Sequence, residues 1–531
     1  MDEVFALVVP YRLYLAAVGV ALLASLLLTP VMRRMAFWLD IVDHPDEHRK
    51  LHARATPLGG GVAVLAAFAL SVTTVAFWSM SQREVFASDA RIVFGLAAAS
   101  LIICAVGLLD DRFHLRGRQK LVGQIVAGVV LIASGLCIER ITVLDVTINL
   151  GIASIPFTLF WLLGAINALN LIDGVDGLAT GVGVVLSLSI AAIADALGHR
   201  TEAFLALAMA GALIGFLAYN RSPASIFLGD AGSMLIGLVV GTLAIRGSFK
   251  GPATAVLSAP IAIWAIPILD VTMAILRRRL TGRSIYIADR GHLHHTLLKR
   301  GYTSGVTASL IGLLCILTGL GAVASVVWNS EWYAFGAIAV VVATLIVTRV
   351  YGHHESRLLG QRVKHLAWSL LPSVRGPEAR MRELRARLEG NQQWEELWET
   401  LTEFAERFDV NSIQLNIMLP AHGEEFHASW ERKGRPDDHE LWHCDIPLIA
   451  HDVTVGRLKI TGVCNAGSVC TWMSDLIAGL KPFESHLLEL ISECFDLPLP
   501  VSAERVSSVE TAADTATYAL RRLTATQLPG R

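Results

Sequence analysis

Residues 152–178 read IASIPFTLFWLLGAINALNLIDGVDGL. An apolar run opens this stretch, and its length suits the roughly 20 residues that a helix needs to cross the hydrocarbon core of a bilayer. Two asparagines and two aspartates then follow at three-residue steps: Asn167, Asn170, Asp173 and Asp176. On a helix this spacing would align the four side chains, but the glycines among them predict a break. Irregular backbone at membrane depth occurs where it lines a cavity, so the stretch predicts a membrane helix that opens into a functional site.

Apolar runs of this kind occupy most of the chain. Hydrophobic residues make up 53% of the 531 positions and charged residues 17%, whereas ordinary soluble domains contain about 25% charged residues. We therefore predict an all-α polytopic membrane protein with about eleven transmembrane helices. Their expected positions are residues 11–32, 57–78, 92–109, 121–138, 152–169, 178–197, 202–219, 231–246, 253–275, 306–326 and 332–350.

The distribution of Lys and Arg predicts how these helices are oriented. With the N-terminus outside, the inside loops carry 17 Lys and Arg residues and the outside loops carry 6. Cytoplasmic loops carry the excess of positive charge, so we expect an N-out, C-in chain. The inside loops also hold nearly all the unusual polar residues, which predicts a site that faces the cytoplasm. The net charge of −2 argues against nucleic acid as a partner.

The chain changes character after the last apolar run. We expect a transmembrane domain at 1–351, a cytoplasmic α+β accessory domain at 352–500 and a disordered tail at 501–531. In the accessory domain, helices are expected at 375–387, 394–408 and 474–494, and strands at 412–418, 425–430, 441–448 and 453–461. This order of elements resembles part of a GAF-type sensory domain.

The first inside loop, residues 43–61, crowds acids, bases and histidines beside the membrane and ends in three glycines. Glycines let the backbone approach a ligand closely, and Arg54 is of the residue type that pairs with phosphate. The alternative is a positively charged inside loop that leads into a glycine-softened helix start.

Asp110 and Asp111 end an apolar run at the second inside loop. Adjacent carboxylates are costly if they are buried at a membrane boundary, and such a pair could bind Mg²⁺ or supply a base. Ordinary boundary acids are the alternative. Asp230, which begins a later span between glycines, is either a metal ligand or a helix N-cap.

A long basic loop near residue 290 carries an arginine and three histidines that together could hold a pyrophosphate: Arg283, His292, His294 and His295. The alternatives are an ordinary loop with no ligand and a zinc site, and zinc is disfavoured because no nearby Cys or fourth His completes a tetrahedral site. Asp270, inside the ninth expected span, could pair with an arginine of this loop.

Taken together, the inside motifs resemble those of a known family. In chain order they are DHPDEHRKLH at 43–52, LLDD at 108–111, NALNLIDGVDGL at 167–178, FLGDAGS at 227–233 and DRGHLHH at 289–295. The set is similar to the WecA/MraY-like polyprenyl-phosphate sugar-1-phosphate transferases, of glycosyltransferase 4 type, over residues 40–301. The histidine motif resembles the UDP-N-acetylglucosamine branch, since Leu293 interrupts the three adjacent histidines usual in the peptidoglycan translocase branch.

This resemblance implies an enzyme that transfers a sugar 1-phosphate, expected to be GlcNAc-1-phosphate, from a UDP-sugar to undecaprenyl phosphate and releases UMP. Such a reaction is the first membrane step in the synthesis of a cell-envelope polysaccharide such as lipopolysaccharide. The resemblance thereby implies a location in a bacterial inner membrane, with the active site facing the cytoplasm. A phospho-MurNAc-pentapeptide transferase-like enzyme, or one specific for another UDP-HexNAc, is the alternative. A homodimer is one oligomeric state in which such an enzyme could occur.

The resemblance also implies roles for individual residues. Asp230 and Asn170 would form the metal site, for Mg²⁺ or alternatively Mn²⁺. Four aspartates would be catalytic: Asp110, Asp111, Asp173 and Asp176. Six residues would bind substrate: Arg54, Asn220, Arg283, His292, His294 and His295.

A metal also suits the chemistry, because the reaction joins two anions whose repulsion has to be screened. A function of another class competes with this interpretation, since ion-coupled secondary transporters also place acids at broken helices. A transporter predicts acids in the middle of spans and symmetry between the halves of the chain. Here the acids lie at the inside ends of spans, and no such symmetry is seen in the sequence.

Overall fold

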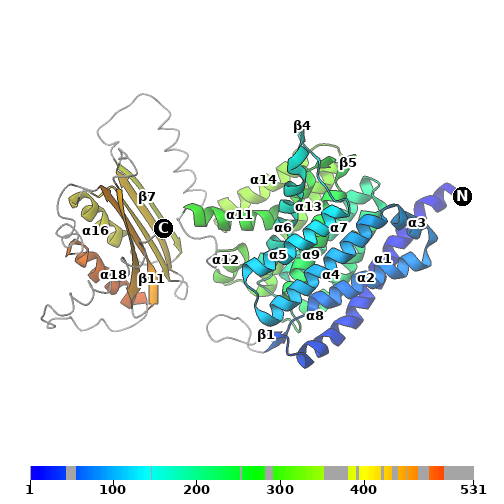
Figure 1. Ribbon diagram of the computed structural model, residues 1–531, viewed down its shortest axis with the longest axis horizontal. Coiled ribbons are helices and arrows are strands. Elements are labelled where there is room, and N and C mark those ends of the chain that lie inside the picture. The colour runs from blue at the N-terminus through cyan, green and yellow to red at the C-terminus, as the bar shows by residue number, and fades with distance from the viewer. Residues whose placement is uncertain are drawn as a thin grey trace, which may run out of the picture. The chain divides into compact units, whose positions relative to one another are not determined.

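The computed structural model describes residues 2–43, 55–144, 146–251, 254–280, 291–351, 381–389, 394–408, 410–419, 424–432, 441–450, 453–463 and 478–494. The chain divides into two compact units, Met1–Leu359 and Gly360–Arg531 (Figure 1).

Helices make up most of the first unit. They are α1 (Asp2–Trp38), α2 (Gly60–Trp78), α3 (Met80–Ser88), α4 (Ala90–Phe113), α5 (Gly117–Ala133), α6 (Ser154–Ile172, preceded by the 3-10 turn η1, Gly151–Ala153), α7 (Leu178–Ala196), α8 (Arg200–Asn220), α9 (Gly229–Arg246), α10 (Ser258–Ile263), α11 (Ala265–Leu280), α12 (Leu293–Lys299), α13 (Ser304–Val327) and α14 (Trp332–Val347).

The lengths of these helices confirm a polytopic membrane protein. Within the described residues, eight helices are long and apolar enough to cross a membrane: α1, α2, α4, α6 with η1, α7, α8, α9 and α13. Three further predicted spans correspond to shorter elements, which are the 17-residue α5, the 16-residue α14 and the pair α10 and α11. The total of eleven spans and their orientation stay predictions.

Helix α9 lies at the centre of the first unit. In the most apolar 18-residue stretch of α9, 83% of the residues are buried, whereas in that of α1 only 28% are buried. It packs against α2, α4, α6, α7 and α8. Large apolar side chains point outward from the peripheral helices instead, as Leu15 and Leu27 do on α1 and Phe94 on α4. Such exposed apolar surface suits contact with lipid chains.

Two glycines allow neighbouring backbones to touch the first turn of α9. A Cβ at Gly61 of α2 would overlap the backbone of Gly232, and a Cβ at Gly107 of α4 would overlap that of Ala231. Small residues permit this close approach of helices in a membrane, where packing rather than the hydrophobic effect drives association. The N-terminal end of α9 is therefore held between α2 and α4.

A small sheet, missed by the sequence analysis, covers one end of the helices. Its order is β4 (Val146–Asn149), β3 (Arg140–Val143), β6 (Thr254–Val256) and β5 (Phe249–Gly251). The prediction of an all-α membrane part is wrong here. These strands have three or four residues each, too short for an alternating pattern, and β3 pairs in parallel with β6 from a distant loop.

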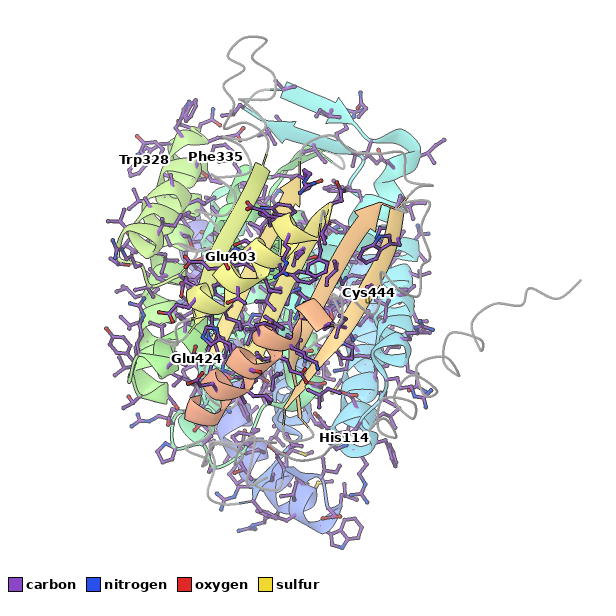
Figure 2. The ribbon with its side chains drawn as sticks, turned by 90° about the vertical axis from the view of Figure 1, so that its left-hand side faces the viewer. His114, Trp328, Phe335, Glu403, Glu424 and Cys444 are labelled. Atoms are coloured by element: carbon purple, nitrogen blue, oxygen red, sulfur yellow. The ribbon has the colours of Figure 1, made fainter. Side chains whose placement is uncertain are left out.

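The opposite end of the bundle carries a two-stranded ribbon, formed by β1 (Val42–Asp43) and β2 (Thr56–Pro57), which pair antiparallel. Figure 1 shows β4 and β5 at one end of the helices and β1 at the other. In Figure 2, Trp328 marks the end with the four-stranded sheet and His114 the end opposite. His114 follows Asp110 and Asp111 at the end of α4, so this motif, which is predicted to lie inside, is at that end.

The second unit is a five-stranded antiparallel sheet with two helices. Its elements are β7 (Met381–Glu389), α16 (Trp394–Arg407), β8 (Ser412–Leu419), β9 (Glu424–Arg432), β10 (Leu441–Ala450), β11 (Val453–Val463) and α18 (Lys481–Cys494), with the sheet order β10-β11-β8-β9-β7. Burial alternates along β8, whose inner residues join Trp394 and Trp398 of α16 in one apolar core. Four strands and the α16 helix agree with the sequence analysis.

One predicted helix of this unit is wrong. Residues 381–387, expected within a charged helix, belong to strand β7, which pairs antiparallel with β9. Their intrinsic preference is helical, but the open edge of β9 offers backbone hydrogen bonds that outweigh that weak preference. The GAF resemblance and the boundaries at residues 351 and 500 stay predictions. The expected tail at 501–531 lies outside the described residues.

The contact at Gly107 predicts a selective loss of stability. We expect Gly107→Ala to lower the free energy of unfolding by about 1–3 kcal/mol, because the added methyl group overpacks the α4–α9 contact. Gly164→Ala is the matched control, since nothing lies within 4 Å of a Cβ at this exposed position in α6. Thermal unfolding of the two variants in detergent measures the difference, and equal melting temperatures would contradict the packing argument.

Candidate active site

Lys120 links two acidic residues that lie far apart in the sequence. Its Nζ is 2.7 Å from Oδ2 of Asp110, at the end of α4, and is also ion-paired with Oδ2 of Asp230, in the first turn of α9. All three side chains are partly buried, so this ammonium group offsets charge repulsion that water screens incompletely. Two of the predicted acidic motifs are thus brought into one cluster.

Asn170 joins the same cluster from the end of α6. Its Nδ2 donates hydrogen bonds to Oδ1 of Asp230, at 2.7 Å, and to Oγ of Ser233, at 3.0 Å. The amide nitrogen therefore faces Asp230, which gives Asn170 an orienting role toward that carboxylate.

Asp111 caps α9 from a neighbouring helix. The backbone N–H of Asp230 donates to its Oδ1 at 2.8 Å, and that of Ala231 donates to its Oδ2 at 3.3 Å. A carboxylate at a helix N-terminus satisfies free N–H groups and meets the positive end of the helix dipole. Gly229 is needed beside it, because its φ is +71° and a Cβ there would lie 2.5 Å from the Asp111 carboxylate.

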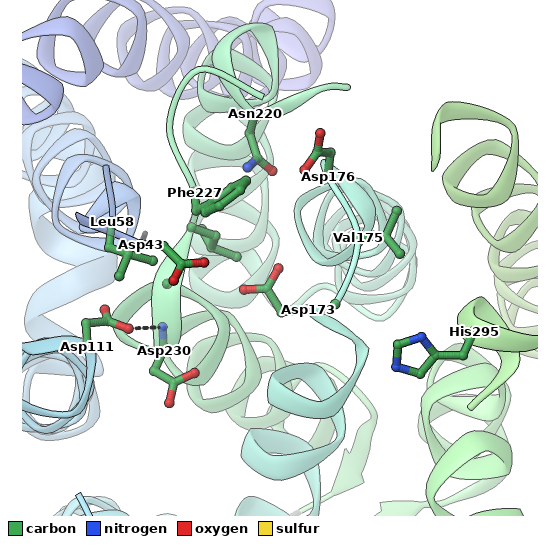
Figure 3. A pocket seen from close by; sticks show the side chains of 13 residues that line it. Asp43, Leu58, Asp111, Asp173, Val175, Asp176, Asn220, Phe227, Asp230 and His295 are labelled. Carbon is green, nitrogen blue, oxygen red and sulfur yellow. Dashed lines mark hydrogen bonds between the residues drawn. The ribbon is translucent and has the colours of Figure 1, made fainter. Parts of the chain in front are cut away.

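A cavity of about 300 Å³ opens beside this cluster (Figure 3). It is lined by Asp43, Leu58, Asp111, Asp173, Gly174, Val175, Asp176, Asn220, Phe227, Leu228, Gly229, Asp230 and His295. Five of these described lining residues are aspartates, and none is a lysine or an arginine. The cavity therefore concentrates negative charge and calls for a cation.

Asp173 shows the effect of this charge. Figure 3 shows the carboxylates of Asp173 and Asp43 facing each other across the cavity. Burial raises the pKa of Asp173 well above its ordinary value, and the neighbouring charges of Asp230, Asp111 and Asp176 raise it further. A bound cation would favour the ionised form of this carboxyl group.

Asp176 and Asn220 support the wall of the cavity. Oδ2 of Asp176 accepts a hydrogen bond from the backbone N–H of Ala224 at 3.0 Å. Asn220 accepts from Oγ1 of Thr180 at 2.7 Å and donates to the carbonyl of Ile226 at 3.0 Å. Both residues thereby shape the loop that leads into α9, while they also line the cavity.

The histidine motif reaches the cavity from the other side. His295 lines it, whereas His292 and His294 are buried beside it. The rings of His294 and His295 lie 4.2 Å apart, centroid to centroid. Burial, with the neighbouring His295 as a second cause, lowers the pKa of His294 to about 3. His294 is therefore a neutral ring that acts through hydrogen bonding and packing rather than through charge.

Two predicted substrate-binding residues, Arg54 and Arg283, lie outside the described residues. Conversely, two residues at the site were not predicted as part of it: Lys120 and Asp43. The signal for Lys120 is its position in the first turn of α5, the helix that follows LLDD. The signal for Asp43 is its place as the first residue of the first loop motif.

The residues present suit a magnesium ion. Mg²⁺ prefers hard oxygen ligands and is commonly held by one or two carboxylates together with substrate phosphates. Asp230 is oriented for such a role, and the Lys120 ammonium already bridges it to a second carboxylate. Within the described part of the chain, no three His, Cys, Asp or Glu side chains converge to hold a metal by themselves. A site completed by substrate oxygens fits this arrangement.

Comparisons with known proteins agree with these motifs. The family profile described as glycosyl transferase family 4 matches residues 93–248. A probable undecaprenyl-phosphate N-acetylglucosaminyl 1-phosphate transferase of Bacillus subtilis is 30% identical over 63% of this chain and 90% of its own length. A decaprenyl-phosphate N-acetylglucosaminephosphotransferase of Mycobacterium tuberculosis is 34% identical over 64% and 90%.

A second kind of relative is the phospho-N-acetylmuramoyl-pentapeptide-transferase of Anoxybacillus flavithermus, 28% identical over 58% of this chain and 97% of its own length. About a third or more of this chain thus lies outside each of these matches. The cluster of acids around Asp230 lies inside the matched family region. The chain is therefore a multi-pass membrane enzyme that belongs to glycosyl transferase family 4, the WecA/MraY-like sugar-phosphate transferases.

Proposed function

We propose that this enzyme transfers GlcNAc-1-phosphate from UDP-GlcNAc to a polyprenyl phosphate such as undecaprenyl phosphate, and releases UMP. The observation that carries the proposal is a cluster built from three separate motifs beside one acidic cavity: Lys120 pairs with Asp110 and Asp230, and Asn170 donates a hydrogen bond to Asp230. Relatives whose names describe GlcNAc phosphate transfer to a polyprenyl phosphate support the choice of reaction.

The choice of sugar rests on two further observations. The relatives named for N-acetylglucosamine are 30–34% identical to this chain, and those named for the muramoyl pentapeptide are 27–29% identical. Leu293 also separates His292 from His294, as in the UDP-GlcNAc branch that the motif resembles. A phospho-MurNAc-pentapeptide substrate is the second candidate, favoured only by that second group of relatives.

The reaction displaces one phosphate by another. An oxygen of the lipid phosphate forms a bond to the sugar-bearing phosphorus, the bond from that phosphorus to the bridging oxygen breaks, and UMP leaves with the electron pair. Phosphoryl transfer of this kind depends mainly on positioning and on charge stabilisation. A bound Mg²⁺ would supply charge neutralisation for the diphosphate, and Asp230, oriented by Asn170, would hold it.

The protein residues supply the positioning. Lys120 places a positive charge between Asp110 and Asp230, where it can pair with phosphate oxygens once substrate enters. A phosphate monoester has a second pKa near 6 and is mostly dianionic at neutral pH, so a strong base is not required. We therefore assign Asp110 the role of orienting Lys120. Asp111, by capping α9, fixes the backbone that carries Asp230.

We further propose that the cavity faces the cytoplasm of a bacterial cell and that the enzyme lies in the inner membrane. The inside loops carry the excess of Lys and Arg. UDP-sugars are soluble, charged substrates, so a site at the end of the helices is reached from water without crossing the bilayer. The product enters the synthesis of a cell-envelope polysaccharide.

A panel of UDP-sugars tests the function directly. With polyprenyl phosphate and Mg²⁺, we expect UMP release and a lipid-linked product from UDP-GlcNAc, at a kcat/KM at least about tenfold above those for UDP-GalNAc and UDP-MurNAc-pentapeptide. UDP-glucose, which lacks the N-acetyl group, is the control. Release of UMP only from the pentapeptide substrate would transfer the assignment to the second candidate. Substrate flux without UMP release would favour a transporter.

The cluster around Lys120 predicts the effect of its removal. We expect Lys120→Met to lower kcat/KM by about a hundredfold or more, because Asp110 and Asp230 lose their shared cation and the phosphates lose a positive partner. Arg91→Met is the matched control, since Arg91 is exposed at the other end of α4. UMP release in purified membranes measures both variants, and an active Lys120→Met enzyme would contradict the assigned role.

The acidic cavity also predicts metal dependence. Removal of divalent cations with EDTA should abolish UMP release, and added Mg²⁺ or Mn²⁺ should restore it. Ca²⁺ should restore little activity, because it prefers more ligands at longer distances than Mg²⁺ does. Undiminished turnover in EDTA would rule out the proposed cofactor while leaving the family assignment intact.

A further inference from the structure

The histidine segment, residues 291–295, lies against the floor of the catalytic cavity. His295 lines the cavity directly. Nε2 of His294 would lie 2.6 Å from a Cβ at Gly174, the residue that follows Asp173. Since only a glycine leaves room for this contact, a small shift of the segment changes the space beside Asp173.

Helix α11 holds this segment at two points. Asp270 accepts hydrogen bonds from the backbone N–H of Leu293, at 2.8 Å, and pairs with Nδ1 of His292, at 2.9 Å. Seven residues later, and so on the same face of the helix, Arg277 donates to the carbonyl of Gly291 at 3.0 Å. The segment is therefore fixed through both its backbone and a ring.

Tyr351 completes the arrangement from beyond the end of α14. Its hydroxyl donates to Oδ1 of Asp270 at 2.7 Å, and the tyrosine is 3% exposed. The carboxylate of Asp270 thus receives hydrogen bonds from Tyr351, Leu293 and His292, which together set its rotamer. The backbone carbonyl of Arg349 also accepts a hydrogen bond from Arg300, just after α12. The residues just after α14 therefore contact both α11, which holds the histidine segment, and the residue that follows α12, which continues the segment.

We propose that Asp270 and Tyr351 are positioning residues for the histidine segment. Asp270 selects the His292 tautomer with its proton on Nδ1 and leaves Nε2 as an acceptor, and Tyr351 holds the Asp270 carboxylate in the orientation that does this. Neither residue is among those that line the cavity. Their effect on the reaction passes through the placement of His294 and His295 beside the nucleotide-sugar.

The test is Tyr351→Phe in the full-length enzyme, which removes one hydroxyl group and keeps the ring. Under the proposed function, we expect the KM for UDP-GlcNAc to rise about five- to tenfold while kcat stays within about twofold, because substrate contacts loosen before the chemistry changes. Tyr333→Phe is the control, since it removes a hydroxyl at the start of α14, where the ring packs on Trp328. It should keep both parameters unchanged.

A second readout does not depend on turnover. Diethyl pyrocarbonate acylates accessible histidines, and peptide mass spectrometry reports the rate at each site. His292 and His294 are 5% and 2% exposed and should react slowly in the native enzyme. Tyr351→Phe, and more strongly Asp270→Asn, should accelerate labelling of both by at least about threefold. The exposed His114 is the internal reference and should react at the same rate in all variants.

The possible results distinguish a failure of the positioning role from a failure of the proposed function. Faster labelling of His292 and His294 in either variant, with a raised KM in an active enzyme, supports the positioning role. Wild-type kinetics and wild-type labelling in both variants would overturn it. If native enzyme released no UMP from any UDP-sugar, the proposed function would fail, and the labelling rates would still decide the role of Asp270 and Tyr351. If Tyr351→Phe did not fold, Asp270→Asn would be judged by the same measures.

Discussion

Repulsion among carboxylates is the constraint on which the catalytic end of this protein depends. Five aspartates line one cavity of about 300 Å³, and Asp110 lies just beside it. Such a group is stable only with cations at close range, since the surrounding apolar helices screen charge poorly. The structure meets this constraint with Lys120 and with the N-terminus of α9, which takes up the Asp111 carboxylate. Lys120 carries a full positive charge and the helix N-terminus a partial one, and both are groups that proteins also use to bind phosphate.

The constraint explains why α9 is the most enclosed helix. Its first turn has to meet α2, α4 and α6 at once, because Asp230 needs partners from more than one of them. Gly61 and Gly107 bring two of those backbones into contact with it, and Gly229 makes room for the Asp111 carboxylate. Packing and charge therefore act at the same place, and the catalytic carboxylate is held by a rigid element.

The histidine segment is held by an acid and a base of a neighbouring helix. It lies outside the residues 93–248 that match the family profile, and Asp270 and Arg277 attach it to α11. An acid inside an apolar helix is costly unless it is fully hydrogen-bonded, and Asp270 meets this condition with three protein partners. A positioning role toward a segment that binds substrate explains why α11 carries Asp270 despite this free-energy cost. The second unit has an apolar core of its own.

The sequence by itself determined the membrane class, the existence of most helices and the identity of the acidic motifs. It could do so because apolar run length and the grouping of polar residues at span ends are local properties. Only the tertiary structure decided which partners these motifs have. The pairing of Lys120 with Asp230 joins residues 110 positions apart, and the parallel pairing of β3 with β6 joins strands of four and three residues from distant parts of the chain. The strand at 381–389 likewise depends on the edge of β9. In each case the deciding interaction is long-range, and local pattern carries no information about it.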